Sequence, residues 1–433
     1  MSNSAKTIEL FQKAYAHIPG YQEFVKSQSV DPDLITNAEN VALIPITSKK
    51  SYLQMYPQAQ LMWPENLKRL TLYCSTSGST GEPYYFPRDE RLSVQLSFPL
   101  EEFMAQREGR TLVLVGFGMG VWIGGIIVLR SLEIAADRMD APVSILPTGY
   151  NKKEVFKALR RLSPDFDQTI IIGYPPFVKE LVDEAEGEDI DLTKLNIRFV
   201  FAAEAFTERF REYLCAKAGV DNLLKDTLNI YGTADLGGMA YETPLSILVR
   251  RLAQEDPLLY KDLFKQIEKT PTLAQYYPEF VDFEEQDGEL LVTGDSAIPL
   301  IRYAVGDRGG TLTFDQVESL LGKYGIDLHK EMAKAGIVRY EKRPFVYVYE
   351  RTDLSATLHG IVIYPEFVKE GLLVDDMPEY FTERFTMSTK NDIHHNQFLQ
   401  VNLELQKGVE PTEELEKKVL KSIRKSLIAK SSE

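Results

Sequence analysis

The stretches DQTIIIGYPPFVKELVDEA (167–185) and NIRFVFAAEAFTERFREYLCAKAG (196–219) decide the fold. Each begins with a short run of β-branched or aromatic residues and continues into a longer amphipathic helical pattern. Two similar units precede them, with TLVLV (111–115) and PVSIL (142–146) as their strands. Four strand–helix units in succession predict a parallel sheet with helices packed on its faces. In such sheets, ligands bind in the loops beyond the carboxyl ends of the strands.

The pattern changes after Thr243, where a tyrosine-rich helical stretch leads to GELLVTGDSAIPLIRYAVGDRGG (288–310), which predicts antiparallel strands and turns. Further on, QFLQVNLELQ (397–406) alternates as a strand, and Thr412 is placed to cap a final helix. We therefore predict an α/β protein of two domains. Residues 1–350 form a large domain of mixed and parallel sheets flanked by helices plus antiparallel strands. Residues 351–433 form a small, mobile α+β domain that we expect to be incomplete.

Bulk composition restricts the function. The 433 residues carry a formal net charge of −15, which argues against a nucleic-acid-binding protein because phosphate contacts need clustered Lys and Arg. Only two cysteines are present, Cys74 and Cys215, and their separation suits neither a disulfide framework nor a zinc ribbon. The N-terminus lacks the features of a signal peptide, and glycines interrupt the most apolar stretch. We expect a cytoplasmic protein that is not embedded in a membrane.

The segment TLYCSTSGSTGEPYYFPRD (71–89) is the first that could carry chemistry. Small hydroxyl residues alternate with glycine, so the backbone could approach a polyphosphate while N–H and O–H donors converge on its oxygens. It does not match the Walker A pattern. Composition alone leaves a Ser/Gly turn between strands equally open.

The order of these residues adds to their composition. TSGSTG followed by Pro83 resembles the phosphate-binding loop of the adenylate-forming superfamily, which contains acyl-CoA synthetases, luciferases and peptide-synthetase adenylation domains. Glu82 stands where many members carry Lys, and we expect its carboxylate to face solvent, away from the triphosphate. The resemblance implies the following phosphate-binding residues: Thr76, Ser77, Gly78, Ser79, Thr80 and Gly81.

Two further segments resemble the nucleotide-binding motifs of this family. FVFAAEAFTERFREYL (199–214) resembles the segment that lines the adenine pocket, and LNIYGTADLGGMAYE (228–242) resembles the Tyr-Gly-x-Ser/Thr-Glu motif. By this resemblance Asp235 takes the place of the Mg²⁺-binding Glu and is a catalytic residue, with Glu242 as a further Mg²⁺ candidate. Ala234 replaces a hydroxyl residue. The implied adenine- and nucleotide-binding residues are Ala202, Ala203, Glu204, Tyr231, Gly232 and Thr233.

The third and fourth matches favour one branch of the family. PLIRYAVGD (299–307) resembles a motif of phenylacetate–CoA ligases and implies that Asp307 and Arg302 bind ribose. YERTDLSATLHGIVIYPEFVKE (349–370) resembles the family's hinge motif, with Arg351 as a catalytic residue and Asp353 as the hinge between the domains. Each segment alone also fits an ordinary strand and turn.

The glycine-rich stretch TLVLVGFGMGVWIGG (111–125) needs a separate interpretation. It begins like a dinucleotide-binding fingerprint, but Val121 stands where the third glycine should be. A comparable loop helps to form the acid pocket of phenylacetate–CoA ligases. Phe117 and Trp122 are therefore candidates for lining an acid pocket, with packing in the core as the alternative.

The resemblance implies an enzyme that uses ATP and Mg²⁺ to convert a carboxylic acid to an acyl-adenylate and then transfers the acyl group to CoA. The expected partners are a small carboxylic acid and CoA, and a homodimer is left open. No position matches the family's C-terminal adenylation lysine. Two alternatives therefore stay open. One is CoA-independent adenylyl or acyl transfer, as in coenzyme F₃₉₀ synthetases and acyl-protein synthetases, and the other is a nucleotide-binding relative with impaired catalysis.

Overall fold

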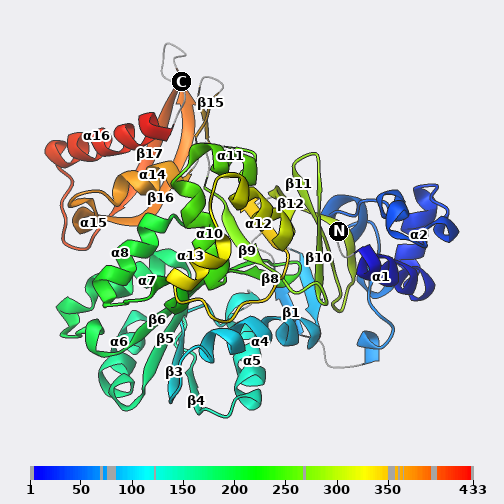
Figure 1. Cartoon of the computed structure of the whole chain (residues 1–433), viewed down its shortest axis with the longest axis horizontal. Coiled ribbons are helices and arrows are strands. Elements are labelled where there is room, and N and C mark those ends of the chain that lie inside the picture. Colours follow the sequence, from blue (N-terminus) through cyan, green and yellow to red (C-terminus); the bar gives the residue numbers. More distant parts are fainter. Residues whose placement is uncertain are drawn as a thin grey trace.

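An eleven-stranded mixed sheet forms the centre of the molecule (Figure 1). The computed structural model describes residues 4–68, 72–75, 84–120, 123–266, 270–349, 356–358, 361–363, 365–391 and 397–430. The strands follow one another in the order β10-β11-β12-β13-β9-β8-β7-β6-β5-β3-β4. One half of this sheet is parallel and the other antiparallel, as the two sequence patterns predict.

The parallel half confirms the four predicted strand–helix units. Its strands are β3 (Thr111–Val115), β4 (Val143–Leu146), β5 (Gln168–Gly173), β6 (Ile197–Ala202) and β7 (Thr227–Thr233). The helices that follow β3 to β6 are α5 (Ile123–Arg138), α6 (Lys152–Arg161), α7 (Pro175–Glu184) and α8 (Glu208–Ala218). Helix α4 (Arg91–Met104) precedes them.

Alternation along these strands explains why both faces of the sheet are covered. Leu112 and Leu114 of β3 pack in a core with α6, α7 and α8. Val113 and Val115 of the same strand pack in a second core with α4 and α5. Successive side chains of a strand point to opposite faces, so an almost continuous apolar run is what a strand between two helical layers requires.

The antiparallel half confirms the second predicted pattern. Its strands are β8 (Gly237–Tyr241), β9 (Thr272–Gln275), β10 (Val281–Gln286), β11 (Glu289–Gly294), β12 (Leu300–Leu312) and β13 (Phe345–Tyr349). The helices beside it are α10 (Pro244–Gln254), α11 (Pro257–Phe264), α12 (Phe314–Lys323) and α13 (Leu328–Lys334). The short α9 (Leu223–Asp226) leads into β7.

The two ends of the chain lie far from each other (Figure 1). The N-terminal helices are α1 (Ser4–His17), α2 (Pro19–Ser27) and α3 (Gln58–Leu61), followed by the hairpin of β1 (Leu72–Ser75) and β2 (Tyr85–Arg88). The C-terminal elements are β14 (Ala356–Leu358), β15 (Ile361–Ile363), α14 (Pro365–Leu372), α15 (Met377–Tyr380), β16 (Phe381–Asn391), β17 (Gln397–Leu405) and α16 (Glu413–Lys430).

These C-terminal elements confirm the predicted strand and capped helix. The Leu415 N–H donates to the Thr412 hydroxyl at 3.2 Å at the start of α16. Helices α14 and α16 and strand β16 share a small apolar core that includes Val368, Phe381 and Ile423. None of the helices within the described ranges is long and apolar enough to cross a membrane.

Candidate functional site

The predicted phosphate-binding residues Thr76, Ser77, Gly78, Ser79, Thr80 and Gly81 lie outside the described residues. The structure does show the two strands that flank them. Strands β1 and β2 pair antiparallel, with Cys74 opposite Phe86 and Ser75 opposite Tyr85. The described residues on either side of the segment 76–83, Ser75 and Tyr85, therefore lie opposite each other.

Tyr231 and Asp307 meet, although they come from different motifs. The Tyr231 hydroxyl donates to Asp307 Oδ2 at 2.6 Å. Tyr231 lies near the end of β7, where the parallel strands meet the antiparallel half, and Asp307 lies on β12. Only 7% of Asp307 is exposed. A carboxylate this buried gains strongly from a charge-assisted hydrogen bond.

The turn between β7 and β8 carries Asp235. Two glycines shape it: a side chain on Gly232 would meet the Gly237 carbonyl oxygen at 2.3 Å, and Gly237 itself has a φ of +68°. The Asp235 main-chain oxygen accepts a hydrogen bond of 2.6 Å from Arg88 Nη1. Arg88 is the last residue of β2 and follows the 76–83 segment. Three of the predicted motif segments therefore converge on one region.

The predicted adenine-pocket residues end β6 and follow it. Ala202 is the last residue of β6, and Ala203 has a φ of +76°, a left-handed conformation that costs energy for a residue with a Cβ. This turn directs the chain away from the sheet. The Glu204 carboxylate forms an ion pair of 3.0 Å with Lys369 of α14, a residue of the C-terminal segment. The structure thus links the predicted adenine side of the site to the predicted small domain.

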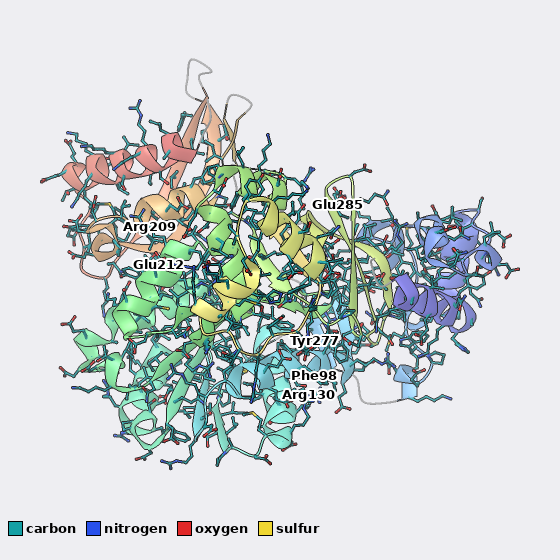
Figure 2. All side chains as sticks on the ribbon, viewed as in Figure 1. Phe98, Arg130, Arg209, Glu212, Tyr277 and Glu285 are labelled. Carbon is teal, nitrogen blue, oxygen red and sulfur yellow. The ribbon has the colours of Figure 1, made fainter. Side chains whose placement is uncertain are left out.

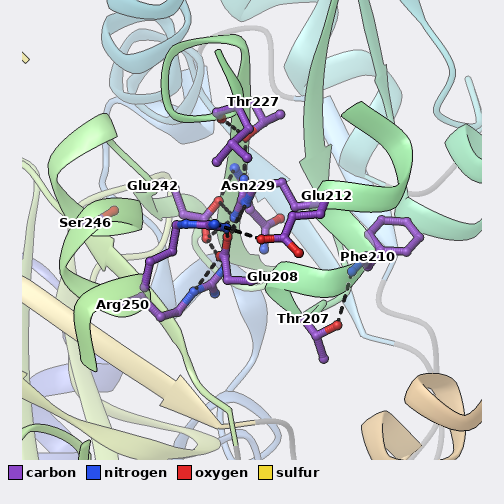
Figure 3. A network of polar contacts seen from close by, with 12 residues as sticks. Thr207, Glu208, Phe210, Glu212, Thr227, Asn229, Glu242, Ser246 and Arg250 are labelled. Carbon is purple, nitrogen blue, oxygen red and sulfur yellow. Dashed lines mark hydrogen bonds and ion pairs between the residues drawn. The ribbon is translucent and has the colours of Figure 1, made fainter. Parts of the chain in front are cut away.

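Glu242, predicted as a further Mg²⁺ candidate, has described partners of its own. It is 1% exposed and lies in a buried ion network that joins β8 to α8 and α10 (Figure 3). Its two oxygens accept hydrogen bonds of 2.9 and 2.8 Å from Arg211, and Arg250 lies 3.1 Å away. The Asn229 N–H also donates to it. These donors occupy the carboxylate, and the turn with Asp235 is at the other end of β8, so the role of Glu242 as a Mg²⁺ ligand stays a prediction.

Glu208 completes the same network. Burial acts to raise its pKa, but the neighbouring Arg211 and Arg250 outweigh this effect and hold the pKa at about 2. Arg251 adds a third ion pair at 3.0 Å. The network therefore depends on a carboxylate that stays ionised, and it lies beside β7, which carries Tyr231, and β8, which follows the turn with Asp235.

Arg302, predicted as a ribose ligand, is also bound elsewhere. Its guanidinium donates to Glu284 at 3.0 Å and to the main-chain oxygens of Ala42 and Ile44 at 3.1 and 2.6 Å. It also donates to Gln286 at 2.9 Å. These contacts fasten the N-terminal segment to β10 and β12. Arg302 thus joins the N-terminal segment to the sheet, and its role as a ribose ligand, like that of Asp307, stays a prediction.

The glycine-rich loop after β3 gives a mixed result. Phe117 is 5% exposed and packs in the core between the sheet, α4 and α5, which is the alternative that its sequence allowed. Trp122 lies outside the described residues, as do Arg351 and Asp353. Sequence reasoning missed an aromatic cluster at this edge of the sheet. The ring of Tyr150 meets those of Tyr174 and Phe177 edge-on, with centroids 5.4 and 5.6 Å apart.

A small apolar cavity of about 10 Å³, the size of one water molecule, lies between α4 and β8. Tyr277, whose ring centroid is 5.6 Å from that of Phe98, forms part of its wall, and Figure 2 labels both side chains. Gly238 lies at its edge, and a Cβ there would meet Leu96 at 2.9 Å. Sequence patterns gave no sign of this cavity.

Among the residues with a described placement, no three His, Cys, Asp or Glu side chains gather as a metal site. Asp235 is half-buried in its turn. Mg²⁺ commonly binds through one or two carboxylates together with substrate phosphates, so the chemistry of this carboxylate fits an ion that arrives with a polyphosphate.

Sequence comparison finds two curated relatives that carry the same name. Phenylacetate-coenzyme A ligase from Pseudomonas putida is 27% identical over 301 residues, which cover 68% of this chain and 62% of the relative. The enzyme of the same name from Thermus thermophilus is 24% identical over 375 residues, covering 84% and 74%. The match spans less than two thirds of the length of the first relative. No protein-family model matches the chain.

Solved structures share the fold. A 2-hydroxyisobutyryl-CoA ligase in complex with 2-HIB-AMP superimposes with a TM-score of 0.69 at 14% identity, covering 98% of this chain and 82% of that one. An open conformation of the same ligase with 2-HIB-AMP and CoA gives a TM-score of 0.61. The chain is thus similar in sequence to two phenylacetate-coenzyme A ligases and shares its fold with a 2-hydroxyisobutyryl-CoA ligase.

Proposed function

We propose that this chain activates a carboxylic acid with ATP and then transfers the acyl group to CoA. In the first step a carboxylate oxygen forms a bond to the α-phosphorus, the bond to the bridging oxygen breaks, and pyrophosphate leaves. In the second step the thiol sulfur bonds to the acyl carbon and AMP leaves. The observation that carries the proposal is the convergence of three motif segments, through Tyr231 with Asp307 and through Arg88 with Asp235.

Asp307, Tyr231 and Asp235 each have a defined role in this proposed reaction. The Asp307 carboxylate accepts hydrogen bonds from the ribose hydroxyls, and the Tyr231 hydroxyl holds that carboxylate in place. The ring of Tyr231 offers a flat face to adenine. Asp235 supplies an oxygen ligand to Mg²⁺, and the ion when bound supplies positive charge against the phosphates. Positioning and charge neutralisation are the main contributions of the protein, so no nucleophilic side chain is needed.

We also propose that the residues after Glu350 form a separate small domain that rests on the site. Two ion pairs join it to the large domain in this structure, Lys369 with Glu204 at 3.0 Å and Arg384 with Glu180 at 2.8 Å. The Arg384 guanidinium also donates to the Tyr174 hydroxyl at 3.3 Å. Its own apolar core supports independent folding. Its cations lie beside the predicted adenine pocket and beside the aromatic cluster.

Exchange of labelled pyrophosphate into ATP, measured over a panel of aryl and aliphatic acids, tests the first step. Acid-dependent exchange is expected, and Asp307→Ala should abolish it while the protein stays folded. Thioester formation upon addition of CoA tests the second step. Exchange without a thioester would support CoA-independent transfer, whereas ATP binding without exchange for any acid would refute the proposed activation.

A further inference from the structure

Arg88 stands out among the buried charges of this molecule. It is 1% exposed, its Nη1 donates to the Asp235 main-chain oxygen at 2.6 Å, and its guanidinium lies 4.7 Å from the centroid of the Phe86 ring. It ends the strand that leaves the predicted phosphate loop. Arg88 therefore contacts the Asp235 turn from the β1–β2 hairpin that flanks the predicted phosphate loop.

Arg88 has no directly paired carboxylate among the described residues. Its Nε and Nη2 have no nitrogen or oxygen hydrogen-bond partner there, and the groups that favour its charged form are the Cys74 thiol, Asp235 and Asp89. Burial lowers its pKa to about 10, against the opposing effects of Cys74 and Asp235. Arg88 thus stays protonated at neutral pH. A buried cation without a matching anion is costly, which makes its surroundings favourable for an anion.

Arg198 is a buried arginine of the same sheet that does have an ion-pair partner. It is fully buried, it stacks on Phe103 at 3.9 Å, and burial lowers its pKa to about 10 as well. Its guanidinium, however, forms an ion pair of 2.9 Å with Asp226 and donates to Gln168 at 2.9 Å. Arg198 lies near the amino end of β6, away from the carboxyl ends where the site is predicted.

We propose that Arg88 is a positioning residue of the nucleotide site, which holds the Asp235 turn against the strand leaving the predicted phosphate loop and whose buried charge favours a polyphosphate. This proposal rests on the proposed function. It does not require contact between Arg88 and the nucleotide. The hydrogen bond to the main chain of Asp235 fixes where that carboxylate points, while the buried positive charge attracts phosphates through a medium of low dielectric constant.

Binding of ATP and of adenosine, measured by calorimetry, tests the role of the charge. Arg88→Met should weaken ATP binding about tenfold or more, the usual effect of losing an interaction with a charged group, while adenosine binding changes by less than about threefold. Arg198→Met is the matched control: it removes an equally buried arginine and should leave the ratio of the two affinities unchanged. If folded Arg88→Met kept the wild-type ratio of ATP affinity to adenosine affinity, the proposal would be overturned.

Arg88→Lys tests positioning and also serves if Arg88→Met does not fold. Lysine keeps the charge but lacks the planar fork. The ATP-to-adenosine ratio should be kept, while kcat for pyrophosphate exchange falls about tenfold or more with little change in KM. Unchanged kcat, or loss of the ATP preference, would contradict the proposal. Failure of the wild-type protein to bind ATP would instead refute the proposed function itself.

Discussion

The hydrogen bond between Tyr231 and Asp307 allows a quantitative test of the site. Tyr231→Phe removes one donor from a carboxylate that is only 7% exposed, at a donor–acceptor distance of 2.6 Å. Hydrogen bonds to charged groups contribute about 1.5–3 kcal/mol, and a lost donor to a buried carboxylate costs towards the upper end of that range. We therefore expect the free energy of unfolding of the ligand-free protein to fall by about 2 kcal/mol.

A double-mutant cycle in urea separates this bond from other effects of the substitutions. The cycle uses Tyr231→Phe, Asp307→Asn and the double variant, and the expected coupling energy is about 1–3 kcal/mol. Tyr276→Phe is the control, since that ring packs on the same Phe283 at 4.8 Å and no described carboxylate accepts from its hydroxyl. Additivity within about 0.5 kcal/mol would refute the assigned bond.

Three other predictions follow from the described contacts. Because the pKa of Glu208 is held at about 2, below the ordinary value of 4.5, its contribution to stability is present above pH 4.5 and is lost as pH falls towards 2. Glu208→Gln should therefore flatten the dependence of the urea midpoint on pH in that window, and an unchanged slope would contradict the pKa. Lys369→Met removes the ion pair with Glu204 and should speed hydrogen exchange in residues 365–391. Its cost in the free energy of unfolding should be less than about 1 kcal/mol. Lys418→Met removes an ion pair with Asp376 inside the C-terminal segment and should not speed exchange in residues 202–206. Asp235→Asn should lower kcat for pyrophosphate exchange about 100-fold with the adenosine affinity unchanged, and full activity would remove Asp235 from the site.

Local patterns were sufficient for the elements of the fold. The runs 111–115, 167–173 and 196–204 became parallel strands that are largely apolar on both faces, as a strand between two helical layers requires. The run 142–146 became the edge strand β4, where Ser144 is exposed. The cap at Thr412 was visible because one side-chain oxygen satisfies a nearby N–H. Neither inference requires information from distant parts of the chain.

The unpredicted partners depend on tertiary contacts. Arg88 follows the loop motif as one charged residue in PRDER, and nothing local shows that it is buried or that it meets Asp235, 147 residues away. The aromatic cluster of Tyr150, Tyr174 and Phe177 likewise draws on two strand–helix units. Pairing across such distances is fixed by the order of strands in the sheet, which strand patterns alone do not specify.

Glu242 and Arg302 both have described partners away from Asp235 and Asp307. Glu242 follows β8, and at roughly 3.3 Å per residue a strand of this length carries it well away from the turn that holds Asp235. Arg302 has a φ of +44°, and β12 pairs irregularly with β11, so simple alternation does not predict where Arg302 and Asp307 point. Arg302 reaches Ala42 and Ile44 while Asp307 reaches Tyr231. A charged residue within a motif is therefore a better site candidate when tertiary contacts bring it beside another motif, as they do for Asp235 and Asp307.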